Sequence, residues 1–467
     1  MKKQAYNPYL PSWEYIPDGE PYVFGDRVYV YGSHDFFNGY VYCMGDYVCW
    51  SAPVDDLGDW RYEGVIFPRD ADPVNRDGKM CLYAPDVTVG PDGRYYLFYV
   101  YDKINIVSVA VCDTPAGLYT FHGYVRYADG TRLGEREGDE PQFDPGVLTE
   151  GDVTYLYTGF AWAHDKTRHG AMVTVLDRDM LTIAEAPRFI APGGAYAAGT
   201  SFEKHPFFEA SSIRKVNGKY YFVYSSAAMH ELCYAVSDSP TGGFTFGGVL
   251  VSNNDMHIGT YKPAPKPVAY GGNNHGSIVD IRGQWYIFYH RHTNGTFFSR
   301  QVCAEPITVL PDGSIPQAEI TSCGLNGGPL QGEGEYPAYI ACHLFTQKDQ
   351  PLSGEPGFPK ITQDGRDGDE LNGYVADIRE GTTIGFKAFD CQGVVRVSVT
   401  TRAYCNGVFD VKTAWDGQTL GSIAVQSSNV WETFGAAVPI PDGVQSIYLS
   451  YRGSGSPHLK SFTLETE

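Results

Sequence analysis

Acidic side chains and one histidine stand at nearly the same distance before five tyrosine-rich segments of this chain. The tyrosines that mark these segments are Tyr29, Tyr96, Tyr155, Tyr221 and Tyr286. The residues 10 to 12 positions upstream of them are Asp18, Asp86, Asp144, Glu209 and His275. Two carboxyl groups with different pKa values can serve as a proton donor and a general base. A single acid before a strand more often bonds exposed backbone amides, so the repetition is what points to chemistry.

The segments around these tyrosines are predicted strands of a repeated unit. They cover residues 27–31, 94–99, 154–157, 219–224 and 284–289, about 65 residues apart. A turn dipeptide precedes each one: Gly25-Asp26, Asp92-Gly93, Gly151-Asp152, Asn217-Gly218 and Arg282-Gly283. Such a period of strands and turns predicts a five-bladed β-propeller with one blade per repeat. Radial repetition would then direct the five upstream residues toward one axis.

The composition supports an all-β protein. The 467 residues include 35 Tyr, 25 Phe, 54 Gly and 30 Pro, a mixture that favours short strands and tight turns.

The net charge of −20, without a Lys/Arg cluster, argues against nucleic acids and anionic membranes as partners. The first residues lack the apolar stretch of a secretory signal, and the ten cysteines form no C-x-x-C pair. We therefore expect a cytoplasmic protein.

The chain is long enough for two domains. The repeats predict a propeller over residues 1–320, and the glycine-dense residues 321–335 are expected to form a linker. Residues 336–467 contain short alternating segments without the propeller pattern. These predict a separate β-sandwich, jelly-roll-like domain.

Several motifs of the repeats together resemble glycoside hydrolase family 43. The matching phrases are Ala84-Pro85-Asp86-Val87, Asp144-Pro145-Gly146, Phe208-Glu209-Ala210-Ser211 and Asn274-His275-Gly276-Ser277. The resemblance covers about residues 7–320. It implies an inverting glycosidase that acts on arabinose- and xylose-containing polysaccharides. We expect the enzyme to be exo-acting, to need no cofactor for its chemistry, and to release α-L-arabinofuranosyl or β-D-xylosyl units from hemicellulose oligosaccharides. Hydrolysis of such acetals needs one carboxyl group as acid and one as base.

The resemblance also implies roles for individual residues. Glu209 would be the general acid, and Asp144 would raise its pKa and orient it. Asp86 and His275 would line the floor of the pocket, with His275 near a cation that some family members hold through water. Arg300 stands where the family has a substrate-binding arginine. Independently of the resemblance, Trp162 and Phe36 flank inner strands, and we expect their rings to stack on a sugar at the rim of the pocket.

The general base has two candidates. The family has an Asp followed by Pro in the first blade, whereas this chain reads Pro17-Asp18-Gly19-Glu20-Pro21. Alignment on the proline selects Glu20, and alignment on the distance to the tyrosine strand selects Asp18. In a strand, residues two apart face the same side, so both would face the pocket. Spacing and the shorter side chain favour Asp18.

Three alternatives stay open at this stage. An endo-acting arabinanase or xylanase would use the same acids, and loop lengths do not separate it from an exo-acting enzyme. A sugar-binding propeller without catalysis would not need carboxyl groups on both sides of a bond. The C-terminal segment resembles carbohydrate-binding modules of family 6, through residues 373–378, 394–399 and 448–451 and Trp431. It would either bind sugar or brace the propeller.

Overall fold

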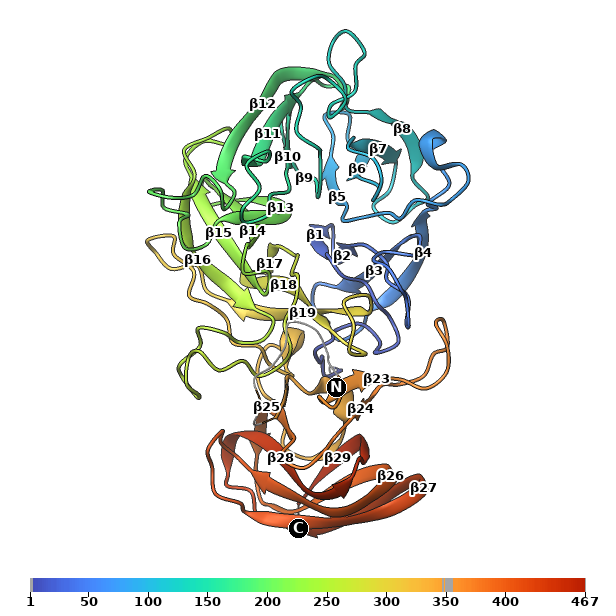
Figure 1. Ribbon diagram of the computed structural model, residues 1–467, viewed down its shortest axis with the longest axis vertical. Coiled ribbons are helices and arrows are strands. Elements are labelled where there is room, and N and C mark those ends of the chain that lie inside the picture. Colours follow the sequence, from blue (N-terminus) through green and yellow to red (C-terminus); the bar gives the residue numbers. More distant parts are fainter. Residues whose placement is uncertain (1–2, 347, 349–355, 467) are drawn as a thin grey trace.

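The computed structural model describes residues 3–346, 348 and 356–466. It consists of five small sheets arranged around an axis and a second β-rich body beside blades one and five (Figure 1). The five-bladed propeller and the all-β class that the sequence predicts are confirmed.

Each blade is an antiparallel sheet whose first strand lies next to the axis. Blade one contains β1 (Glu20–Phe24), β2 (Arg27–Tyr31), β3 (Tyr47–Pro53) and β4 (Arg61–Phe67). Blade two contains β5 (Asp86–Val89), β6 (Tyr95–Tyr99), β7 (Ser108–Cys112) and β8 (Thr120–Tyr124). Blade three contains β9 (Gly146–Glu150), β10 (Val153–Thr158), β11 (Gly170–Leu176) and β12 (Ile183–Pro192). Blade four contains β13 (Phe207–Val216), β14 (Lys219–Ser226), β15 (Glu231–Ser237) and β16 (Thr245–Ser252). Blade five contains β17 (Ile278–Ile281), β18 (Gln284–His292) and β19 (Arg300–Ile307).

The predicted turn dipeptides join the first two strands of their blades. Asn217 and Gly218 have φ values of 51° and 83°, between the paired residues Val216 and Lys219. Two successive positive φ values are those of a type I′ turn, whose twist matches that of the flanking strands. Local sequence thus determines where each hairpin closes.

Buried tyrosines link neighbouring blades. Tyr31 in blade one donates a hydrogen bond to the carbonyl of Pro115 in blade two, over 2.8 Å. Tyr157 in blade three donates to the carbonyl of Pro240 in blade four, over 2.7 Å. The rings fill the space between blades while each hydroxyl keeps a partner, which explains why the repeats use tyrosine as well as phenylalanine.

The ring closes through the N-terminal segment. In the part of the chain that the structure describes, no fourth strand pairs with the outer edge of β19, and Asn7 lies beside it. The Asn7 amide accepts from the Ala304 N–H and donates to the Ala304 carbonyl, both over 2.9 Å. One buried side chain therefore satisfies the backbone groups that a fourth strand would pair.

The second body is one ten-stranded sheet that curls over its own core. Its strands are β20 (Leu330–Gln331), β21 (Gly334–Pro337), β22 (His343–Phe345), β23 (Lys360–Thr362), β24 (Tyr374–Ala376), β25 (Thr383–Cys391), β26 (Val394–Lys412), β27 (Gly421–Ala437), β28 (Gly443–Gly455) and β29 (His458–Thr466). Three short 3-10 helices complete the described elements: η1 (Pro73–Asn75), η2 (Gly324–Asn326) and η3 (Ala338–Ile340).

Residues 321–335 differ from the linker that their glycine content predicts. They carry η2, β20 and the first residues of β21, and β20 pairs with β25 while β21 pairs with β29. The glycines allow close approach to neighbouring backbone: a Cβ on Gly332 would lie 2.3 Å from the carbonyl oxygen of Asp390.

No helix of the described residues is long and apolar enough to cross a bilayer.

Candidate active site

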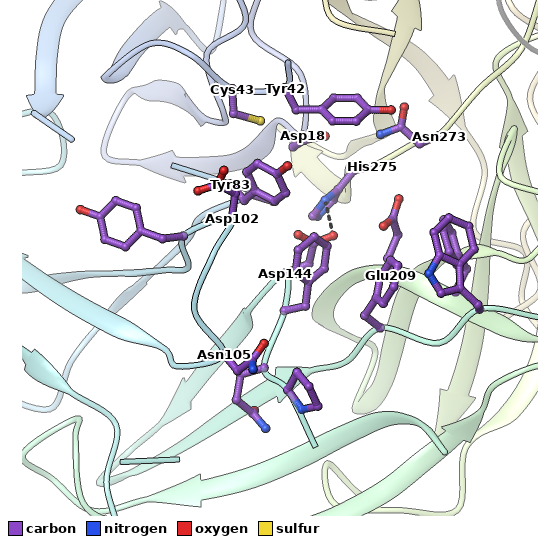
Figure 2. Close-up of a pocket in the computed structure, with 18 of the residues that line it drawn as sticks. Asp18, Tyr42, Cys43, Tyr83, Asp102, Asn105, Asp144, Glu209, Asn273 and His275 are labelled. Carbon is purple, nitrogen blue, oxygen red and sulfur yellow. Dashed lines mark ion pairs between the residues drawn. The ribbon is translucent and has the colours of Figure 1, made fainter. Parts of the chain in front are cut away.

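A cavity of about 400 Å³ opens at the propeller axis. Its charged lining residues include Asp18, Asp144, Glu209, His275 and Arg300, contributed by blades one, three, four and five. Figure 2 shows Asp18, Asp144, Glu209 and His275 converging on this space. The repeat spacing predicts this convergence for these four residues.

Asp18 stands just before β1 in a left-handed conformation, with φ of 59°. Its Oδ2 accepts a hydrogen bond from Ser33 (2.7 Å), and its Oδ1 accepts one from Arg300 Nη1 (3.0 Å). The same Arg300 makes a two-pronged ion pair with the buried Asp35, over 2.8 and 3.0 Å. Asp18 is therefore held in one orientation by a charged neighbour that is itself fixed.

Glu20 does not line the cavity. It is fully buried, and its Oε2 accepts from Arg214 (2.7 Å) and Ser212 (3.0 Å). Since Asp18 has a positive φ and lies outside β1, the two acids do not share one face of a strand. The expectation that both face the pocket is corrected: only Asp18 reaches it.

Strand register explains why Asp86 also lies away from the cavity. Glu20 pairs with Tyr31, and Asp86 pairs with Phe98; each partner is the second residue after its repeat tyrosine. Asp86 therefore occupies in blade two the ladder position that Glu20 occupies in blade one. The number of residues before the repeat tyrosine had instead placed Asp86 as equivalent to Asp18. It is fully buried below the pocket floor, where it accepts from Tyr22 (2.6 Å) and the Val147 N–H (2.7 Å).

Asp144 and Glu209 come from neighbouring blades and are joined through the backbone. The Ala210 N–H donates to Asp144 Oδ2 over 3.1 Å. Irregular register on both sides of Glu209 interrupts the pairing of β13 with β14, and Ala210 has φ of 68°. Bulges of this kind redirect a side chain out of the normal alternation. Here the bulge places Glu209 at the cavity.

Burial and like charge raise the pKa of both acids. Burial is the main cause for Glu209, and the charges of Asp144 and Asp18 raise its pKa further above the usual range. Burial also raises the pKa of Asp144 to about 7, although His275 opposes the shift. Within the described residues, no protein hydrogen bond holds the Glu209 carboxyl group, so its proton is available to a bound molecule.

His275 lies between two carboxylates. Its Nδ1 is 3.6 Å from Asp144 Oδ2, and its Nε2 is 3.6 Å from Glu20 Oε1. Burial opposes its charge, yet Glu20, Asp144 and Asp18 together raise the pKa of His275 to about 9. The three carboxyl groups therefore favour the protonated form of His275 at the floor of the pocket.

The remaining predicted sugar contacts fall in different places. Arg300 lines the cavity but is only 2% exposed, with its donors used by Asp18 and Asp35. Trp162 lies on the rim, 55% exposed, with its ring 5.0 Å from that of Phe208. Phe36 does not line the cavity; its ring packs edge-on against His34. It therefore has no direct access to a molecule in the pocket.

Most of the aromatic residues that line the cavity, here called the aromatic wall, were not predicted from the sequence. The lining aromatic residues besides Trp162 are Tyr42, Tyr83, Tyr101, Phe143, Phe160 and Phe208. Two of them, Phe143 and Phe208, directly precede Asp144 and Glu209, a pattern that the sequence does contain. The polar residues Asp102, Asn105 and Asn273 also line the cavity and were not expected.

The model of the family described as "Glycosyl hydrolases family 43" matches residues 16–315, the whole propeller apart from its N-terminal closure. The chain belongs to glycoside hydrolase family 43. It is 65% identical to "Xylosidase/arabinosidase" of Thermoclostridium stercorarium over the full length of both chains. It is 31% identical to "Xylosidase/arabinosidase" of Bacteroides ovatus, over 60% of this chain and 87% of that one.

Solved structures of the family share the fold. The family 43 enzyme of Xanthomonas citri complexed with xylose matches 68% of this chain and 95% of its own, with 25% identity and a TM-score of 0.53. The family 43 arabinoxylan arabinofuranohydrolase of Bacillus subtilis, in complex with cellotetraose, matches 99% of this chain and 97% of its own. Its identity is 22% and its TM-score is 0.52, so the likeness is one of fold.

As a family 43 glycosidase, the protein hydrolyses glycosidic bonds with inversion at the anomeric carbon. The pocket provides what this chemistry needs: Asp18 oriented as a charged acceptor, and Glu209 favoured in its protonated form.

The fit of a cation near His275 can be tested on the donor atoms. The two carboxylates near this histidine face opposite ring nitrogens, and no group of three ligand atoms that includes His275 occurs within the described residues. A cation would also have to compete with the proton that these carboxylates favour on the ring. The described residues around His275 therefore do not fit a metal that is coordinated by protein atoms alone.

Proposed function

We propose that this enzyme removes single β-D-xylosyl or α-L-arabinofuranosyl units from the ends of hemicellulose-derived oligosaccharides. The observation that carries this proposal is one cavity of about 400 Å³ that holds Asp18 and Glu209 together. This volume is near the lower limit of ordinary small-molecule sites, about 300–1,000 Å³. It suits a terminal sugar rather than a long chain. The 65% identical relative carries the name "Xylosidase/arabinosidase".

In the proposed mechanism Glu209 donates its proton to the oxygen of the leaving sugar. Asp18 removes a proton from a water molecule, which attacks the anomeric carbon from the opposite face. An inverting enzyme holds these carboxyl groups about 6.5–9.5 Å apart so that the water fits between them. Burial raises the pKa of Glu209, and the charge of Asp144 raises it further, so Glu209 keeps its proton. His275 Nδ1 lies 3.6 Å from Asp144 Oδ2 and orients that carboxyl group.

The aromatic rim supports a sugar ligand. Trp162 presents an exposed ring beside Phe208 and Phe160, and such faces stack on sugar rings. Xylopyranose and arabinofuranose are rings of isomeric pentoses, and the aromatic wall does not discriminate between them by size.

Two substrates with different leaving groups test the roles directly. Nitrophenolate leaves without much help from an acid, whereas the sugar of xylobiose needs a proton. We expect Glu209→Gln to lose about 10²–10⁴-fold in kcat on xylobiose and much less on nitrophenyl xyloside. Asp18→Asn should lose a similar factor on both substrates, because both need an activated water.

Product analysis separates this proposal from its rivals. Release of monosaccharide alone, with inverted configuration by NMR, supports exo action; release of longer oligosaccharides from arabinan or xylan would replace it with an endo-acting enzyme. A wild-type protein that binds xylo-oligosaccharides without cleaving them would be a sugar-binding propeller.

We also propose that the chemistry needs no metal. The acid and the base are both carboxyl groups of the chain, and the positive charge at the pocket floor is supplied by His275. Enzyme treated with EDTA and desalted should keep its kcat within about twofold, since no catalytic proton transfer passes through a metal. Complete loss of activity, restored by calcium alone, would contradict this part of the proposal.

A further inference from the structure

Blade four carries a second group of chemically capable side chains outside the catalytic pocket. His230 ends the turn between β14 and β15, Glu231 is the first residue of β15, and His257 lies in the loop after β16. One ligand atom of each residue lies within 4.8 Å of the others. None of these three residues lines the cavity at the propeller axis.

Glu231 is oriented by its neighbours. It is 1% exposed, and its Oε1 accepts hydrogen bonds from Ser226 (2.5 Å) and from His205 Nδ1 (2.6 Å). Its Oε2 instead faces His257 Nε2, at 3.2 Å. One carboxylate oxygen is therefore fixed from behind, and the other is directed toward the histidines.

His230 has the same kind of support. Its Nδ1 lies 3.0 Å from the Ser252 hydroxyl, which leaves Nε2 as the nitrogen free to bind a ligand. Its ring centroid is 5.9 Å from that of His257. Metal-binding histidines characteristically have one nitrogen hydrogen-bonded, because this bond sets the tautomer and the direction of the ring.

We propose that His230, Glu231 and His257 form a binding site for a zinc-class divalent metal ion. Two imidazoles and one carboxylate are a donor set that Zn²⁺ accepts in sites with an open fourth position. The His257 side chain is 47% exposed, so the ion can enter from solvent and keep a water ligand. Calcium and magnesium prefer oxygen ligands and should bind poorly to two nitrogens.

The site would stabilise the blade next to the pocket. Met229, the residue before His230, lines the cavity. The His230 carbonyl accepts hydrogen bonds from the Asn253 N–H (2.9 Å) and from Asn274 (3.3 Å), the residue beside His275. A metal that joins His230 to His257 thus ties the β14–β15 turn to the loop after β16. The effect is on stability rather than on the bond-breaking step.

Calorimetric titration of tag-free, EDTA-treated full-length enzyme with ZnCl2 tests the proposal. We expect one site with a Kd of about 1 μM or tighter and a rise in Tm at saturation. CaCl2 should give no heat of binding at the same concentrations. His257→Asn should weaken zinc binding by about 100-fold while keeping the fold, since residue 257 has φ of 72° and Asn tolerates that region.

The matched control is His164→Asn, which removes another exposed histidine and should leave the Kd unchanged.

His205, Glu231 and Cys233 form an overlapping group of possible ligands. Zinc binding that survives His257→Asn but is lost in Cys233→Ser would assign the ion to that group and overturn the proposal. Absence of zinc binding to the wild-type enzyme would overturn it as well.

Discussion

At the scale of single residues, Asp18 and Glu20 occupy different environments, although their spacing in the sequence did not show which of them faces the pocket. Asp18 lies in the pocket, held by Ser33 and Arg300. Glu20 lies in a buried layer below it and compensates the charge of Arg214. That layer spans the axis: Ser212 of blade four also bonds Ser277 of blade five, over 2.7 Å. We therefore propose that Asp18 acts in catalysis and that Glu20 supports the pocket from below.

Separate substitutions should divide these tasks experimentally. Asp18→Asn should lower kcat by about 10²–10⁴-fold, because the pocket loses a base. The free energy of unfolding should change little, because Arg300 keeps its two-pronged ion pair with Asp35. Glu20→Gln leaves Arg214 buried without its carboxylate and should cost about 3–5 kcal/mol of stability. Urea unfolding and kcat are the two measurements. A stable Glu20→Gln variant that has lost its activity, beside an active Asp18→Asn variant, would reverse the assignment.

The pH dependence should report the influence of Asp144 on Glu209. The general acid works only when protonated, so activity falls as pH rises through the pKa of Glu209. The negative charge of Asp144 raises that pKa, after burial as the main cause. Asp144→Asn should therefore move the alkaline limb of the kcat profile to lower pH. An unchanged limb, or one at higher pH, would show that another group controls it.

At the scale of elements, close contact between first strands positions the acids. β9 carries Gly146, two residues after Asp144, and lies against β13 near Ser211, two residues after Glu209. A Cβ on Gly146 would lie 2.5 Å from the Ser211 carbonyl oxygen. Backbone cannot move aside as a flexible side chain can, so this glycine sets how closely blades three and four approach.

Gly146→Ala should thus disturb both structure and catalysis. Forcing the strands apart should cost about 1–3 kcal/mol of stability, the usual range for overpacking. It should lower kcat more than it changes KM, because the acid moves relative to the base. Gly242→Ala is the matched control, since a Cβ there meets no atom within 4 Å and its φ is not in the left-handed region. Equal effects of the two substitutions would refute the role of this contact.

At the scale of the whole molecule, segments from both ends of the chain complete the propeller. Asn7 closes blade five, and residues of the C-terminal body bind the propeller directly. Arg291 donates to the carbonyls of Tyr339 (2.7 Å) and Ala341 (3.1 Å), and Lys387 pairs with Glu319 over 2.7 Å. In blade one, the Phe37 N–H donates to Asp367 Oδ1 over 2.6 Å. The C-terminal body therefore contacts blades one and five, whatever its affinity for sugar.

Removing the Asn7 amide should weaken this closure. Asn7→Ala leaves the buried Ala304 N–H without its acceptor, which costs about 1–3 kcal/mol. The free energy of unfolding in urea should fall by that amount, with kcat of the folded fraction nearly unchanged. The control is Asn38→Gly: Asn38 is exposed and has φ of 58°, which glycine adopts without strain, so this variant should have little effect. A loss no larger than that of Asn38→Gly would mean that the ring closes by other contacts.

The sequence by itself determined the all-β class, the five blades, the hairpin positions and the convergence of Asp18, Asp144, Glu209 and His275 on one axis. Strand and turn preferences are local, and repetition converts them into radial geometry. Only the tertiary structure placed Asp86 below the pocket and separated Glu20 from Asp18, because ladder register depends on turn length and on backbone conformation that counting residues does not include. The tertiary structure also determined which aromatic residues line the cavity, because the packing of the blades brings together residues that are far apart in sequence.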